Sequence, residues 1–205
     1  ITPSNLTAGS ETAVDSTSFG GGSYGNDPYG EPRPESTLGV PATTWSLDQW
    51  GQYLLACSNA DGKIYEWQLN TSTIAAVLSN APTGNTAIMV TDERFVFALG
   101  AGGNPRKIQW SDRENNNLWA AAATNEAGSI ELQTSGVIQC GVRVQNQALI
   151  LTTTDAHTAT YSGPPYVYGV ERVGTSCGCV SAQGVAVVDM GAVWMGRESF
   201  FVYSG

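Results

Sequence analysis

The segment Tyr53-Leu54-Leu55-Ala56-Cys57 is followed by the polar stretch Asn59-Ala60-Asp61-Gly62 and then by Ile64-Tyr65-Glu66-Trp67. A short apolar run, a stretch of turn-forming residues and a second run that ends in an aromatic residue are typical of a β-hairpin. The segment therefore predicts two antiparallel strands joined by a tight polar turn.

Three more segments repeat this plan. They are residues 95–99 with 108–110, residues 148–151 with 158–161, and residues 192–195 with 200–203. The aromatic residues that close the second strands are Trp67, Trp110, Tyr161 and Tyr203, so the intervals between them are 43, 51 and 42 residues. The last copy has another aromatic residue, Trp194, in its first strand. We expect these five aromatic side chains to lie in the cores of the repeated units.

Each interval has room for two further strands. The candidates are residues 73–78, 87–91, 129–133, 137–144, 185–188 and, as a weaker case, 170–173. Four strands in every ~40–50 residues is the pattern of a β-propeller blade. A sandwich of two stacked sheets is the alternative, but it does not account for so regular a period. We therefore predict an all-β fold of β-propeller-like, four-stranded antiparallel blades.

The chain divides into two parts by composition. Residues 1–44 are rich in Gly, Pro and Ser and show no apolar periodicity, which predicts either a flexible linker or an extended arm. As an arm, this segment would be held by neighbouring subunits through Phe19, Tyr24 and Tyr29, and its deletion would weaken assembly without preventing folding. Residues 45–205 provide about three and a half blades, fewer than a closed propeller requires. We expect an incomplete ring that further polypeptide or another subunit completes.

Composition argues against most enzymes. The 205 residues carry 9 basic and 18 acidic side chains, a net charge of −9, and contain a single histidine. A field of this sign repels phosphate and disfavours tight binding to nucleic acid. We expect His157 to be solvated in a hairpin turn, and Asp61, Asp92 and Asp112 also occupy expected turn positions. The sequence therefore predicts no catalytic, cofactor-binding or metal-binding residues, and no cofactor.

The four cysteines are Cys57, Cys140, Cys177 and Cys179. The first two lie within apolar runs, where a free cysteine packs as a small apolar side chain. The last two are separated by one glycine, a spacing too short for an ordinary zinc site without other ligands nearby. Reduced structural thiols are therefore favoured over a disulfide, and a metal site is the least favoured of the three.

The second interval is the longest because it contains an insertion at residues 111–125. Asp112 can close the turn by accepting hydrogen bonds through its carboxylate. Trp119 has two interpretations, since it either plugs the end of a blade or belongs to a loop that contacts a neighbouring subunit. Asp112 and Trp119 are therefore candidate subunit contacts.

Several motifs resemble a known family. They are Tyr24-Gly25 and Tyr29-Gly30 before residues 44–51, residues 106–112 with Trp119 downstream, and residues 161–169, which lead through Cys177-Gly178 to residues 193–196 and 200–205. Together they are similar to the propeller hub, or nozzle, proteins of bacteriophage tails. Complete proteins of that family are expected to be longer than this chain.

The resemblance implies a structural virion protein that is assembled in the host cytoplasm as a ring of identical subunits around the DNA exit channel. It implies no catalytic residues, no membrane contact and partners among the adaptor, fibre or needle proteins of the tail, while DNA passes without specific binding. Within the third motif, Pro164, Pro165 and Tyr166 are further candidate subunit contacts. A receptor- or carbohydrate-binding propeller of a virion is the alternative, and a propeller-type glycan lyase or sialidase is third.

The charge adds an expectation about the assembled ring. Lys and Arg on a channel wall would bind phosphate, so a channel that passes DNA freely needs few of them. We expect Asp, Glu and neutral polar residues to face the channel, with most of the nine basic residues at subunit contacts or outside. The competing interpretation is that the acidic composition serves solubility alone.

Overall fold

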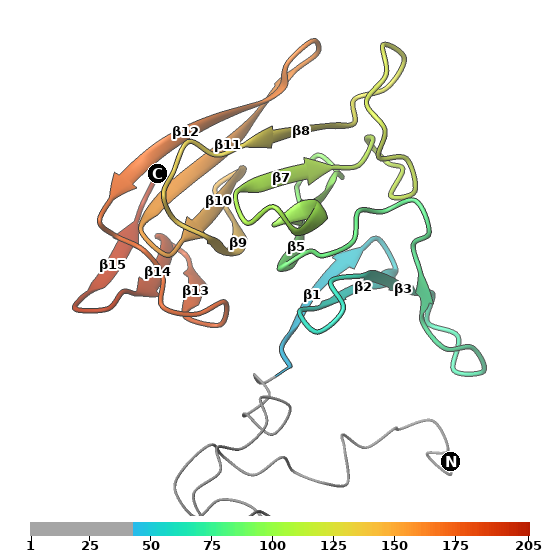
Figure 1. Ribbon diagram of the computed structural model, residues 1–205, viewed down its shortest axis with the longest axis horizontal. Coiled ribbons are helices and arrows are strands. Elements are labelled where there is room, and N and C mark those ends of the chain that lie inside the picture. Colours follow the sequence, from blue (N-terminus) through green and yellow to red (C-terminus); the bar gives the residue numbers. More distant parts are fainter. Residues whose placement is uncertain (1–42) are drawn as a thin grey trace, which may run out of the picture. The chain divides into compact units, whose positions relative to one another are not determined.

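The computed structural model describes residues 43–205, and within them the chain is all-β (Figure 1). Fifteen strands form four antiparallel sheets, and the only helical element in this part is a single 3-10 turn, Ala101–Gly103. The expected arm, with Phe19, Tyr24 and Tyr29, lies outside the described residues. No helix in the range 43–205 is long and apolar enough to cross a membrane.

Each sheet is a meander whose strands follow one another in sequence order. The first sheet contains β1 (Trp45–Trp50), β2 (Tyr53–Ser58), β3 (Ile64–Trp67) and β4 (Ala76–Val77). The second contains β5 (Ala87–Val90), β6 (Val96–Leu99), β7 (Lys107–Trp110) and β8 (Gly128–Glu131). The third contains β9 (Ile138–Val144), β10 (Gln147–Thr152), β11 (Asp155–Gly163) and β12 (Val167–Thr175). The fourth contains β13 (Val185–Val188), β14 (Gly191–Met195) and β15 (Phe200–Tyr203).

The repeated hairpins of the sequence are the second and third strands of these sheets. They correspond to β2 with β3, β6 with β7, β10 with β11, and β14 with β15. Every additional strand candidate is also present, although β4 is only two residues long and the weak candidate at 170–173 lies within the nine-residue β12. The structure adds β1, which the sequence had not identified as a strand.

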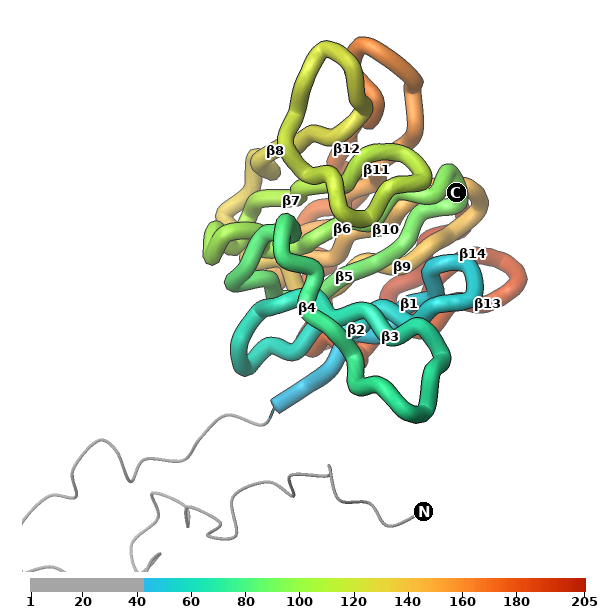
Figure 2. Tube along the Cα trace, turned by 90° about the vertical axis from the view of Figure 1, so that its right-hand side faces the viewer, coloured from blue at the N-terminus to red at the C-terminus, as the bar shows by residue number. Residues whose placement is uncertain are grey.

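The sheets lie face against face around a common centre. The first strand of each sheet contacts the first strand of the next, β1 with β5, β5 with β9 and β9 with β13. Figures 1 and 2 show these strands toward the middle of residues 43–205, with the later strands farther out. This arrangement explains why β5 and β6 of the second sheet are apolar and buried on both sides, since both faces of an inner sheet pack against a neighbour.

Three apolar clusters fill the spaces between successive sheets. The cluster between the second and third sheets is the most aromatic, with Phe95, Phe97, Trp110 and Tyr168 in edge or tilted contact. The other two clusters lie between the first and second sheets and between the third and fourth. Neighbouring sheets are therefore held together mainly by apolar contact between their faces, whereas hydrogen bonds join the strands within each sheet.

The expected core aromatics are confirmed with one exception. Trp110 and Trp194 are buried, and Tyr161 and Tyr203 are half-buried against the same clusters. Trp67 was expected in a core, but it is half-buried on the side of the first sheet that faces away from the second. Its cross-strand partner is Leu54, one position away from the buried Leu55, and a shift of one residue moves a side chain to the opposite face.

One carboxylate joins the first strands of three sheets near the centre. Asp48 in β1 accepts a hydrogen bond at Oδ2 from the Val90 N–H of β5, at 2.6 Å. Its Oδ1 lies 3.0 Å from Nη2 of Arg143 in β9. Asp48 therefore fixes the relative positions of three neighbouring strands through polar contacts in an otherwise apolar region.

Candidate functional site

The three predicted contact residues of the third motif lie together at the tip of the β11–β12 hairpin. Pro164, Pro165 and Tyr166 are all exposed, and Tyr166 is 81% exposed. A large aromatic side chain in that position is available to a partner, whereas Val167 and Tyr168, which follow it directly, are buried in the cluster between the second and third sheets. Their role as subunit contacts stays a prediction.

The insertion at residues 111–125 is held together by hydrogen bonds between its own residues, and the Trp119 side chain is buried. Its side chain is 3% exposed within the cluster between the first and second sheets, and its Nε1 donates to the Asn116 carbonyl at 2.7 Å. Asp112 is half-buried and accepts the Glu126 N–H at 2.8 Å. The prediction of Trp119 as a subunit contact is therefore wrong, because its ring is the plug that the alternative interpretation described.

The same insertion lies beside the β11–β12 hairpin (Figure 2). Tyr161 of β11 donates a hydrogen bond to Glu126 Oε2 at 3.0 Å, and the Arg113 guanidinium lies 5.8 Å from the centre of the Tyr161 ring. Tyr161 therefore links the β11–β12 hairpin to Arg113 of the insertion and to Glu126, which follows it.

His157 is not in a turn, as the sequence suggested, but in the interior of β11. It is 4% exposed, and it pairs with Ile150 of β10 and Arg172 of β12. Its Nδ1 is buried without a hydrogen-bond partner and lies 3.7 Å from Oδ1 of Asp155. The sequence missed this because β11 begins at Asp155, within what had been interpreted as the turn.

Stability should fall as the pH falls below about 6.5, because burial lowers the pKa of His157 from its usual 6.5. Asp155 opposes this shift and Arg172 reinforces it. The unfolded chain then binds a proton that the folded chain excludes, which costs at most about 1.4 kcal/mol per pH unit. Thermal unfolding of the wild type and of His157→Gln at pH 7.5 and 5.5 measures this. A variant that loses as much stability as the wild type over this range would contradict it.

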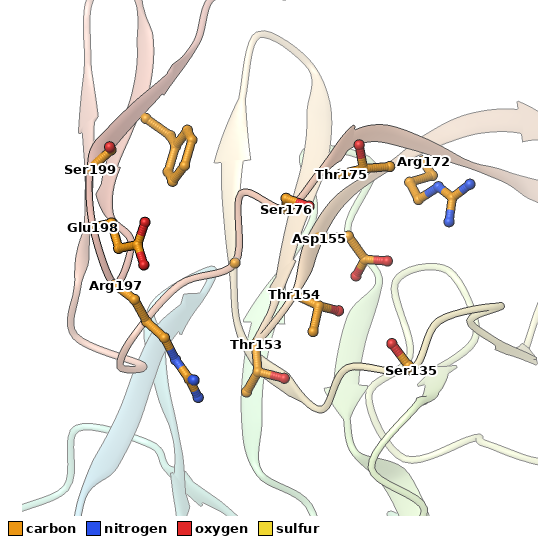
Figure 3. Close-up of a pocket in the computed structure, with 12 residues that line it drawn as sticks. Ser135, Thr153, Thr154, Asp155, Arg172, Thr175, Ser176, Arg197, Glu198 and Ser199 are labelled. Carbon is orange, nitrogen blue, oxygen red and sulfur yellow. The ribbon is translucent and has the colours of Figure 1, made fainter.

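A polar cleft opens between the third and fourth sheets (Figure 3). Its volume is about 750 Å³. Its lining includes two arginines, two carboxylates, hydroxyl side chains and one aromatic ring: Ser135, Thr153, Thr154, Asp155, Arg172, Thr175, Ser176, Gly178, Arg197, Glu198, Ser199 and Phe201. Such a lining can donate and accept hydrogen bonds, but it holds no group of three or more metal-ligating side chains, and none occurs elsewhere in residues 43–205.

The space between the first strands at the centre is small and uncharged. It has a volume of about 370 Å³, and residues of β1, β5, β9 and the segment leading into β13 line it. None of these lining residues is acidic or basic. At about 30 Å³ per water molecule, this space holds on the order of a dozen waters and is far too small for a DNA duplex.

The four cysteines are buried and none forms a disulfide, as predicted. Burial, with a smaller contribution from Asp61, raises the pKa of Cys57 to about 12. Cys140 and Cys179 lie side by side, and this contact together with burial raises the pKa of Cys140. The same contact lowers the pKa of Cys179. All four cysteine side chains pack in the apolar clusters between sheets.

The first and last sheets each have an apolar face that no other strand of residues 43–205 covers. We call these the N-terminal and C-terminal open faces. The N-terminal open face consists of Trp45, Leu47, Tyr65, Trp67 and Val77, on the side of the first sheet opposite the second. The C-terminal open face consists of Val188, Val193, Met195, Phe200 and Val202, on the side of the fourth sheet opposite the third.

The exposure of these faces is unusual for side chains of this size. Phe200 is 75% exposed, and Val202 and Leu47 are each 60% exposed. The inner sheets carry equally apolar strands, such as β6, but bury them completely. The apolar character of β15 was visible in the sequence, yet only the position of the sheet at the end of the series shows that one face is left open.

Comparisons with known proteins give no further guide. No protein-family model matches the sequence, and no curated protein matches it either.

Proposed function

We propose that the chain is a structural component of a bacteriophage tail, of the hub or nozzle type, and that its four sheets are propeller-like blades. Copies of the chain would meet through their open faces and form part of a ring around the DNA exit channel. The observation that carries the proposal is the pair of apolar open faces at the two ends of one series of sheets.

The packing inside the chain supports contact between unlike open faces. Each internal pair of sheets already joins two apolar faces, so the C-terminal open face of one copy can pack on the N-terminal open face of the next in the same way. Fully burying a Val, Leu or Phe side chain contributes roughly 1.5–3 kcal/mol, so burying several at once favours association. Neither open face contains an acidic or basic side chain, so the net charge of −9 is not concentrated where copies would touch.

In this proposal the DNA channel is the space enclosed by the assembled subunits. The space among β1, β5, β9 and β13 is too small to be that channel. The exposed β11–β12 tip with Pro164, Pro165 and Tyr166 then faces other subunits or other tail proteins. Acidic or neutral residues on the channel wall remain part of the proposal, since they would let phosphate pass without being held.

The size of the purified chain in solution tests the role of the open faces. We expect a concentration-dependent oligomer, measured by light scattering after size exclusion, that Phe200→Glu converts to a monomer because a charge in an apolar contact is costly. Ile74→Glu is the matched control, because Ile74 is 77% exposed but lies outside both open faces. A chain that stays monomeric at high concentration, or that Ile74→Glu dissociates equally, would contradict the proposal.

The placement in a tail is tested on the intact particle. Cryo-electron microscopy should show the four sheets in a ring on the tail axis, with neighbouring copies joined at Phe200 and Leu47. Density for this chain elsewhere in the particle, or open faces covered by an unrelated protein, would rule out the proposed arrangement.

A further inference from the structure

We propose that the cleft between the third and fourth sheets is a binding site for an uncharged saccharide. The site goes beyond the proposed structural role and does not depend on it. Its volume of about 750 Å³ lies within the range of roughly 300–1,000 Å³ that is usual for small-molecule sites.

Four separate segments build the walls. Arg197, Glu198 and Ser199, between β14 and β15, form one wall, and Thr154 and Asp155, where β11 begins, form the opposite one (Figure 3). The end of β12 and the segment between β8 and β9 complete the lining with further hydroxyl groups. A cleft built between two sheets keeps its shape as long as the sheets stay packed.

Asp155 is oriented by the protein before any ligand arrives. The residue is 5% exposed, and its Oδ1 accepts hydrogen bonds from the hydroxyls of Thr134, at 2.8 Å, and Thr152. Its Oδ2 accepts none from the described residues, although Asp155 lines the cleft. A carboxylate oxygen that the protein leaves free, in a side chain held in place through its other oxygen, can accept a hydrogen bond from a ligand hydroxyl.

The two arginines of the cleft are also available to a ligand. Arg94, Arg106 and Arg143 pair with carboxylates elsewhere, but neither Arg172 nor Arg197 forms an ion pair within residues 43–205. The Arg197 guanidinium can therefore donate to ligand oxygens without first breaking an internal contact. Arg172 pairs with His157 on the face of the third sheet that is turned toward the second, where it also lines another pocket, so it borders the cleft only at its edge.

The balance of these groups selects the class of ligand. The two carboxylates accept hydrogen bonds, the two guanidiniums donate them, and the hydroxyl side chains can do either. The two negative and two positive charges cancel, so the lining has no net charge. A saccharide offers hydroxyls that donate to Asp155 and Glu198 and accept from the arginines. A phosphorylated ligand would gain nothing from the net charge, and an apolar ligand would leave the polar lining unpaired.

An aromatic ring at the edge of the cleft fits the apolar face of a sugar. Phe201 lines the cleft and is half-buried, and its ring stacks on Trp194 at a centroid distance of 5.9 Å. The stacking fixes the ring while part of it stays accessible. The C–H groups on one face of a sugar ring can then pack on it while the hydroxyls reach the polar walls.

Calorimetric titration with four hexasaccharides tests the proposal. The uncharged probes are maltohexaose, cellohexaose and chitohexaose, and the charged probe is a hyaluronan hexasaccharide. We expect at least one uncharged probe to bind, and Arg197→Gln to weaken its binding by about tenfold, the effect of losing one charge-assisted hydrogen bond. Arg172→Gln should have a smaller effect, because Arg172 borders the cleft at its edge. Both residues are exposed, so the variants should fold normally, and thermal unfolding checks this.

Arg113→Gln is the matched control, because Arg113 is an exposed arginine that lies outside the cleft and, like Arg197, forms no ion pair within residues 43–205. It should leave binding unchanged. Failure of all three uncharged probes, binding of the charged probe alone, or equal binding by the Arg197→Gln and Arg113→Gln variants would each overturn the saccharide site. The oligomeric state of Arg197→Gln should match the wild type, so this test and that of the structural role fail separately.

Discussion

Replacing Phe97 by alanine is expected to lower the free energy of unfolding by about 3–5 kcal/mol. The Phe97 side chain is fully buried between the second and third sheets, with its ring 4.7 Å from that of Tyr168 and 5.9 Å from that of Trp110. Its removal leaves a cavity that the rings around it cannot fill without leaving their own contacts. Since whole domains are stable by only about 5–15 kcal/mol, denaturant unfolding should show a large loss of stability.

Phe200 provides the matched control for this prediction. It is the same residue type, but it is 75% exposed on the C-terminal open face. In the dissociated chain at low concentration, Phe200→Ala should change the free energy of unfolding by less than about 0.5 kcal/mol. Equal losses for the two variants would show that Phe200 is buried in the folded chain, or that Phe97 does not support the core.

Replacing Asp48 by alanine should cost about 1.5–3 kcal/mol of stability. The change leaves the Val90 N–H without the acceptor that lies 2.6 Å from it, and it removes the contact with Arg143. The hydrogen bond should dominate because Asp48 is mostly buried, whereas the Arg143 side chain is 44% exposed and its ion pair is screened by water.

Two further variants separate the contributions of Asp48. Asp48→Asn keeps an oxygen for the Val90 N–H and should retain most of the stability. Arg143→Gln removes only the ion pair and should cost less than about 1 kcal/mol. If chemical denaturation shows that Arg143→Gln is as damaging as Asp48→Ala, the ion pair and not the hydrogen bond holds the first strands together.

The repeated hairpins could be predicted because their signal is local. Each second strand contains a short apolar run, and each third strand carries an aromatic residue at or near its end, so the period was visible in the sequence. β1 was harder to identify because its sequence, Trp-Ser-Leu-Asp-Gln-Trp, mixes polar and apolar residues. The polar residue Asp48 interrupts the apolar pattern of β1, and its role is to contact Val90 and Arg143 of two other sheets. Because these partners are far away in the sequence, the local pattern does not reveal that role.

Trp67, Trp119 and His157 show what local patterns leave undetermined. The face that Trp67 occupies depends on strand register, and the burial of Trp119 depends on how a loop folds over two sheets. His157 looked like a turn residue because threonines and an aspartate surround it in the sequence. It is buried because it lies in β11, which is flanked by β10 on one side and β12 on the other. The cleft is a similar case, because its walls come from four segments that only the packing of two sheets brings together.

In the proposed assembly, the two open faces would make each chain a bifunctional monomer in the sense of polymer chemistry. Because the faces differ, their contact is head-to-tail, and such contacts repeat until the rotation per subunit closes a ring or, if it does not close, extend into a filament. A chain with one blocked face, such as Phe200→Glu, can still join a growing end through its N-terminal open face but cannot be extended. Mixed with normal chains, it acts as a chain terminator, and its effect on assembly then exceeds its share of the mixture.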